Sequence, residues 1–143
     1  MPVITAVANT LTKPLPRVLS PKAHAVADYL TIGSLLAAAA LFWCRNPKAS
    51  LGAIVCAGAG LATSLLTDYP GGVAKVISYP THGKIEIGLA AMMATVPEFL
   101  AFNDDKEKKF FLAEAAAVTA VSNLTDFRPK PVRVADRMAR MAS

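Results

Sequence analysis

The chain has 143 residues, enough for one domain, and 54% of them are hydrophobic while only 17% are charged. Together with a positive mean hydropathy, this composition exceeds what soluble domains of this size usually carry and favours an integral membrane protein. The net charge of +5 does not indicate nucleic-acid binding, because the basic residues flank apolar runs, where they orient helices and meet anionic lipid.

Residues 1–19 precede the first apolar run. They include Lys13, Pro14, Pro16 and Arg17, and they contain no apolar stretch as long as a signal peptide requires. We therefore expect residues 1–19 to form a cytoplasmic tail.

Four apolar runs follow, and each is a candidate transmembrane helix. Residues 29–44 and 49–67 contain no charged side chain, and a helix needs about 20 mostly apolar residues to cross the hydrocarbon of a bilayer. The third and fourth runs, residues 83–102 and 110–127, are interrupted by charged residues. Their assignment as spans depends on an internal repeat.

A shift of 58 positions aligns the first half of the chain with the second. His24 then falls on His82, and the acidic residue four positions after each histidine matches as well. At the other end of the repeat, residues 66–69 (Leu-Thr-Asp-Tyr) fall on residues 124–127 (Leu-Thr-Asp-Phe). One shift that matches both ends of a helical hairpin indicates a tandem duplication. If the first hairpin crosses the membrane, its copy should cross it too.

The predicted fold is therefore an all-α, integral membrane four-helix bundle from a tandemly duplicated two-helix hairpin. Short polar turns at residues 45–48 and 103–106 join the helices within each hairpin. The predicted divisions are a cytoplasmic tail at 1–19, a four-span domain at 20–127 with repeats at 20–69 and 79–127, and a basic amphipathic tail at 128–143.

The distribution of Lys and Arg predicts the orientation. The face that holds both termini and the middle linker carries more of these residues than the face with the two short turns, and basic residues accumulate on the cytoplasmic side. We expect a multi-pass protein of the inner (cytoplasmic) membrane with both termini cytoplasmic.

Several of these segments form a pattern that is similar to a known family. The pattern begins with His24, which is followed four residues later by Asp28, and continues with Leu-Thr-Asp-Tyr at residues 66–69. A Thr-His pair at residues 81–82 then precedes a second acid at residue 86 and an apolar stretch. Over residues 20–127 it resembles the SPW-repeat integral membrane proteins of prokaryotes, with Val-Pro-Glu at residues 96–98 where the naming Ser-Pro-Trp would stand. The resemblance brings no established activity with it.

Six titratable residues should gather at the cytoplasmic end of the predicted bundle. Each histidine precedes an acid by four positions, so each pair lies on one face of its helix, and two aspartates follow the even-numbered spans. Imidazoles and carboxylates are the ligand inventory of di-iron and di-manganese carboxylate bundles, although those proteins use Glu-x-x-His spacing. The candidate metal ligands are His24, Asp28, Asp68, His82, Glu86 and Asp126.

Three other interpretations of these residues stay open. His24 and His82 lie at equal depth and could be the axial ligands of one haem. Alternatively, no cofactor is bound: the acids cap helix ends or pair with Lys22, Lys84 or Arg128, and the histidines are interfacial hydrogen-bonding residues. The remaining interpretation is a path for a proton or small solute.

The sequence contains no nucleophile elbow, phosphate loop, zincin helix or dinucleotide fingerprint, so we do not expect an enzyme. We expect an accessory or structural subunit of a larger membrane assembly, with a metal- or haem-binding protein and a small transporter as alternatives. The predicted partners are the lipid bilayer, anionic lipids at the cytoplasmic face, and other membrane proteins or further copies of the chain, with no nucleic acid.

Overall fold

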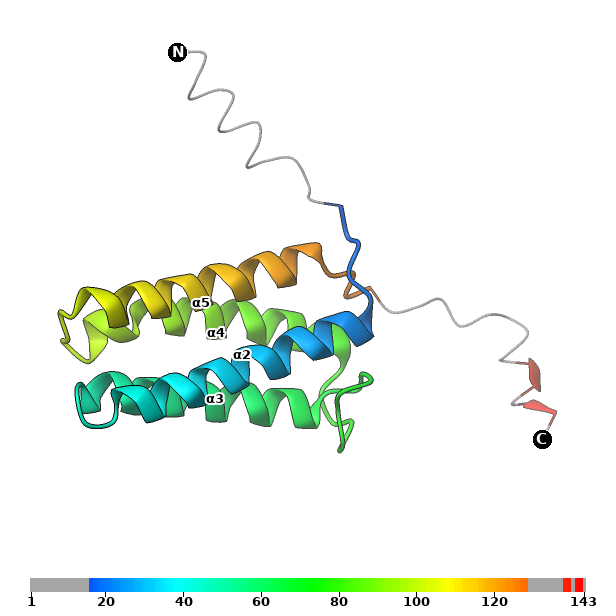
Figure 1. The fold of residues 1–143 in the computed structure, drawn as a ribbon. Coiled ribbons are helices and arrows are strands. Elements are labelled where there is room, and N and C mark those ends of the chain that lie inside the picture. Colours follow the sequence, from blue (N-terminus) through cyan, green and yellow to red (C-terminus); the bar gives the residue numbers. More distant parts are fainter. Residues whose placement is uncertain (1–15, 129–137, 140, 143) are drawn as a thin grey trace, which may run out of the picture.

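The computed structural model describes residues 16–128, 138, 139, 141 and 142, and its main body is a bundle of four antiparallel helices (Figure 1). Within the described residues there is no strand, only two isolated bridges, which confirms the all-α prediction. The helices are α2 (Pro21–Phe42), α3 (Pro47–Leu66), α4 (Tyr79–Phe99) and α5 (Asp105–Leu124).

All four helices begin earlier than the apolar runs, α3 by two residues and the others by more. The hydroxyl of Ser20 accepts a hydrogen bond from the amide of Ala23 at the start of α2, and Ser78 does the same for Thr81 at the start of α4. A proline stands in the first turn of each, where its missing N–H costs nothing. The apolar runs exclude the first turns of α2, α4 and α5 because those turns contain charged or polar residues, whereas the predicted repeats at 20–69 and 79–127 begin within one residue of α2 and α4.

Each helix packs on its neighbours around the bundle. The contacts are most extensive within the hairpins α2–α3 and α4–α5, while α3 also packs on α4 and α2 on α5. The starts of α2 and α4 and the ends of α3 and α5 meet at one end of the bundle, which we call the linker end (residues 16–24, 63–82 and 122–128). The chain leaves the bundle toward both termini from this end (Figure 1).

The shift of 58 positions is visible in three dimensions. Helices α2 and α3 begin at Pro21 and Pro47, and α4 and α5 begin at residues 79 and 105. The isolated bridge between Leu19 and Thr125 has its counterpart in the bridge between Ile77 and Thr67. Each hairpin therefore contacts the other in the same way, which is the pattern of a two-fold axis, here running along the bundle.

The middle of the bundle and its far end are filled by apolar and small side chains. Leu35, Ala53 and Phe111 are fully buried. A Cβ atom on Gly52 would lie 2.6 Å from Cγ1 of Val96, so α3 approaches α4 closely only because residue 52 has no side chain. This packing gives the four helices fixed relative positions.

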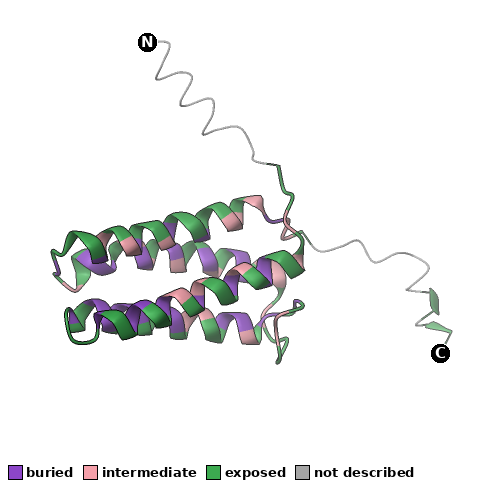
Figure 2. Cartoon of the chain, viewed as in Figure 1, coloured by how far each residue is buried: buried purple, intermediate pink, exposed green. Residues whose placement is uncertain are grey.

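Much of the outward surface of the helices is exposed (Figure 2), and many of the exposed side chains there are large and apolar. Leu30, Leu41 and Val55 are each more than half exposed. By length and composition, α2 and α3 are the two described helices that qualify as membrane spans. The predicted tails lie mostly outside the described residues, since these exclude 1–15 and 129–137.

Candidate metal centre

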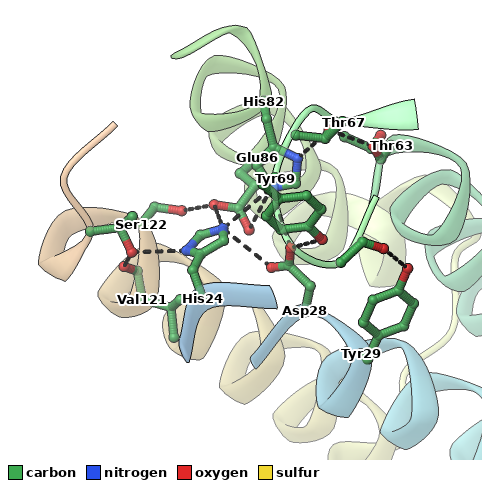
Figure 3. A network of polar contacts seen from close by, with 12 residues as sticks. His24, Asp28, Tyr29, Thr63, Thr67, Tyr69, His82, Glu86, Val121 and Ser122 are labelled. Atoms are coloured by element: carbon green, nitrogen blue, oxygen red, sulfur yellow. Dashed lines mark hydrogen bonds and ion pairs between the residues drawn. The ribbon is translucent and has the colours of Figure 1, made fainter. Parts of the chain in front are cut away.

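Four of the six predicted ligands meet inside the bundle, in the first two turns of α2 and α4 (Figure 3). They are His24 and Asp28 from α2, and His82 and Glu86 from α4. All four are buried, with exposed fractions between 0% and 8%. One potential ligand atom from each residue lies within 4.8 Å of those from the other three.

The helical period explains this convergence. Residues four apart share one face of a helix, so each histidine and its acid point the same way. The contacts place α2 and α4 across the bundle from one another, because each packs on α3 and α5. The inward faces of these two helices therefore bring two imidazoles and two carboxylates to the bundle axis.

The spacing of the four groups fits one ion between them. The Nε2 atoms of His24 and His82 are 3.2 Å apart. Nε2 of His24 lies 3.3 Å from Oδ1 of Asp28 and 3.3 Å from Oε2 of Glu86. Nε2 of His82 approaches the other oxygen of each carboxylate, with Oδ2 of Asp28 at 3.3 Å and Oε1 of Glu86 at 3.8 Å. Ligands about 2.0–2.1 Å from a tetrahedral zinc ion are about 3.3–3.4 Å from one another, whereas charge-assisted N–H···O bonds are shorter, about 2.7–2.9 Å.

The hydrogen bonds on the far side of each imidazole determine where its proton lies. Nδ1 of His82 is 2.8 Å from the hydroxyl of Thr67, and that hydroxyl donates to the carbonyl of Thr63. Thr125 makes the same two contacts, with Nδ1 of His24 and the carbonyl of Val121. Because each hydroxyl proton is used on a carbonyl, each hydroxyl accepts from Nδ1–H.

A neutral imidazole that carries its proton on Nδ1 has a lone pair on Nε2. In this tautomer the two Nε2 lone pairs would face each other at the bundle axis across 3.2 Å, and either a proton on one Nε2 or a metal ion between the two atoms relieves their repulsion. Second-shell hydrogen bonds of this kind fix the tautomer and orientation of histidines that bind metals.

The two carboxylates have hydroxyl partners as well. The phenol of Tyr69 donates to Oδ2 of Asp28 at 2.7 Å, and Ser122 donates to Oε2 of Glu86 at 2.5 Å. Burial and the adjacent Asp28 carboxylate raise the pKa of Tyr69, so this phenol keeps the proton that it donates. All four ligand residues from α2 and α4 are thus oriented by hydroxyls at or just beyond the ends of α3 and α5.

Aromatic rings cover the site at the linker end. The rings of Phe127 and His24 are 5.1 Å apart between centroids, as are those of Tyr69 and His82, and Tyr79 lies between the two groups. A Cβ on Gly83 would come within 2.8 Å of the Phe127 ring, so this glycine makes room for the cover. The buried hydroxyl of Tyr79 has no hydrogen-bond partner among the described residues.

The charge of the cluster is not balanced by basic side chains. Within residues 16–128, no Lys or Arg forms an ion pair with Asp28 or Glu86, and Lys22 and Lys84 are exposed. Buried charges are costly unless they are paired. Two ionised carboxylates would be balanced either by a divalent cation or by a proton on each imidazole, and both arrangements place positive charge at the axis.

The other two predicted ligands lie elsewhere, which corrects the six-residue prediction. Asp68 is exposed and pairs with Lys75 at 3.5 Å. Asp126 pairs with Arg128 at 2.8 Å and with Arg17 at 3.7 Å, and the hydrogen bonds from Arg128 lower the pKa of Asp126. Both carboxylates follow the last turn of a helix and point away from the axis, so the cluster holds ligands for one ion and not for a dinuclear centre.

The residues do not fit a haem. A porphyrin bound through both histidines would have to pass between their Nε2 atoms, which are 3.2 Å apart. The carboxylates of Asp28 and Glu86 occupy that region and contact both imidazoles. The bis-histidine interpretation is therefore set aside on geometry.

Acidic residues at the opposite end of the bundle have local partners. Arg45 donates to Glu107 at 2.7 Å, and Lys108 lies 3.5 Å from Glu98. Glu114 accepts from Ser34, which belongs to α2. None of these acids belongs to the histidine cluster.

No known protein family, curated protein or solved structure matches the chain. The resemblance to SPW-repeat proteins therefore stays a prediction, and the function has to be argued from the site itself.

Proposed function

We propose that this chain is a multi-pass membrane protein whose helical bundle binds one divalent transition-metal ion through His24, Asp28, His82 and Glu86. The donor set favours zinc, because imidazole nitrogens and carboxylate oxygens are common zinc ligands, and the 3.2 Å between the two Nε2 atoms is close to the separation of two ligands on one zinc ion. The observation that carries the proposal is the convergence of one potential ligand atom from each of the four buried residues within 4.8 Å of the others, with the two Nε2 atoms 3.2 Å apart.

Helix length supports the membrane part of the proposal. The four helices have 20 to 22 residues, and at about 1.5 Å per residue each is about 30 Å long, the thickness of the bilayer hydrocarbon. Only α2 and α3 qualify by composition, but α4 and α5 repeat their positions in the bundle. We propose that all four cross, with both termini on the cytoplasmic side.

The distribution of polarity supports the same conclusion. The exposed residues of α4 between Lys84 and Glu98 are apolar or carry only a hydroxyl, and those of α5 between Lys109 and Asn123 are similar. The ionised groups of the cluster, in contrast, are buried at the axis. Large exposed apolar surfaces mark membrane contact, and ionisable residues in membrane spans face the bundle interior.

The chemistry of the ligand set supports the metal part. Imidazole nitrogens favour zinc and its neighbours among the transition metals, and carboxylates neutralise a divalent charge. Each of the four ligand residues also forms a hydrogen bond with one hydroxyl group from α5, from the end of α3 or from the residues that follow these helices. The core below the cluster is apolar, with Leu35, Met93 and Phe111 buried there, so the proposal includes no transport path.

Metal content of the protein purified in detergent without chelators tests the proposal. We expect about one zinc per chain in the wild type, none in His24→Ala, and a wild-type content in Asp126→Asn, which removes an acid outside the cluster. Equal, substoichiometric metal in the wild type and His24→Ala would contradict the proposal. The accessory-subunit interpretation, with a purely hydrogen-bonded cluster, would then be preferred.

A further inference from the structure

A small cavity lies beside three of the four proposed ligands, on the side of α3. Asp28, His82 and Glu86 form one wall of it, and Thr31, Thr63 and Ser64 supply hydroxyl or backbone groups to another. Its volume is about 30 Å³. A cavity needs about 10–15 Å³ of such space, and polar partners, to hold one water molecule, so this one has room for two.

The cavity exists because the two repeats differ. Gly60 and Val118 are equivalent under the shift of 58 positions, and both line the cavity. A Cβ on Gly60 would meet only Ile32, at 3.4 Å. A valine in both repeats would fill the space, so the glycine in the first repeat opens it.

A second difference leaves a hydroxyl group beside this space. In the second repeat, Ser122 donates to the Glu86 carboxylate. In the first, Asp28 accepts from Tyr69, whose equivalent is Phe127. Ser64, the equivalent of Ser122, makes no hydrogen bond with Asp28, although both lie in the described part of the chain, and it faces the cavity instead.

We infer that the bound metal ion takes up an exogenous fifth ligand from this cavity, either water or a small anion no longer than two touching water molecules. The inference rests on the proposed metal centre. Zinc is usually four-coordinate but can expand its coordination to five ligands, so a fifth ligand would change the geometry of the four side chains around the ion. The first repeat has Gly60 where the second has Val118, so it lacks the side chain that would exclude such a ligand.

The test uses the full chain loaded with Co²⁺, whose visible absorption reports the number and kind of ligands, and azide as the probe ligand. In the wild type we expect azide to change the Co²⁺ bands with saturation. In Gly60→Val we expect equal Co²⁺ binding and azide affinity weakened by at least about tenfold, because the side chain occupies the cavity. Gly58→Val, on the same helix but facing outward with nothing within 4 Å, should behave like the wild type.

The outcomes separate the two proposals. No stoichiometric Co²⁺ in the wild type would overturn the metal centre and, with it, this inference. Bound Co²⁺ whose spectrum ignores azide would leave the metal centre standing and show that its coordination is closed. An unchanged azide response in Gly60→Val would show that the ligand binds somewhere other than the cavity.

Discussion

Replacement of Thr67 by valine tests whether the hydroxyl groups around the imidazoles belong to a metal centre. Valine has nearly the same shape as threonine, so the change removes the acceptor for Nδ1–H of His82 and little else. Thr67 is fully buried and His82 is 1% exposed, so water does not replace the lost acceptor. A buried donor without a partner costs about 1–3 kcal/mol.

This cost should appear in the metal affinity. With no acceptor at Nδ1, the imidazole can move its proton to Nε2, the atom that binds the ion, and metal binding must then reverse that change. We expect the zinc affinity to fall by about 10- to 100-fold, the usual effect of losing a second-shell hydrogen bond. Thr125→Val should weaken binding by a similar factor, because Thr125 holds His24 in the same way.

The assay is competition with a chromogenic zinc chelator, on protein in detergent. Thr119→Val is the matched control, since the hydroxyl of Thr119 also donates to a carbonyl within α5 but lies outside the cluster. If Thr67→Val weakens zinc binding no more than Thr119→Val does, the hydroxyl does not fix the imidazole tautomer, and the reasoning from the hydrogen-bond network fails.

Three further predictions concern stability, measured by thermal melting in detergent. Replacing His24 and His82 by alanine, singly and together, should lower the melting temperature non-additively in the presence of zinc, because either loss already abolishes the site. Independent, additive effects would contradict a shared ion. Gly83→Ala should destabilise the fold by about 1–3 kcal/mol through the clash with Phe127, and an equal effect of Gly88→Ala, which has nothing within 4 Å, would show that the clash is not the cause. Arg45→Met should destabilise the fold by about 1–3 kcal/mol because it leaves the buried Glu107 carboxylate without its partner. Adding Glu107→Gln should restore much of this loss. If it does not, the loss comes from the packing of the Arg45 side chain and not from the ion pair.

The repeat was the feature from which most of the fold could be predicted. One shift aligned both ends of the hairpin and thereby assigned the third and fourth helices, whose charges hide them from a hydropathy scan. The apolar runs alone begin too late for α2 and α4, because the polar first turns that hold His24 and His82 look unlike a span, and the bounds of the repeat supplied these starts instead. The caps at Ser20 and Ser78 and the adjacent prolines were the available signal.

The site was predictable only as far as helical periodicity reaches. It placed His24 with Asp28 and His82 with Glu86, since residues four apart share a face. It could not place Asp68 and Asp126, which lie beyond the helix ends, where no period fixes the direction of a side chain. The repeated threonine beside each aspartate marked the duplication, but its role as an imidazole partner depends on how α3 and α5 pack against α4 and α2.

The central claim is that one ion is held by two imidazoles and two carboxylates, and X-ray absorption spectroscopy at the zinc edge tests it most directly. For the zinc-loaded chain, the account predicts only nitrogen and oxygen ligands at about 2.0–2.2 Å, with the outer-shell scattering of two imidazole rings. His82→Ala should lose this spectrum. A sulfur ligand at about 2.3 Å, from Cys44 or Cys56, or a spectrum without imidazole scattering, would contradict the account.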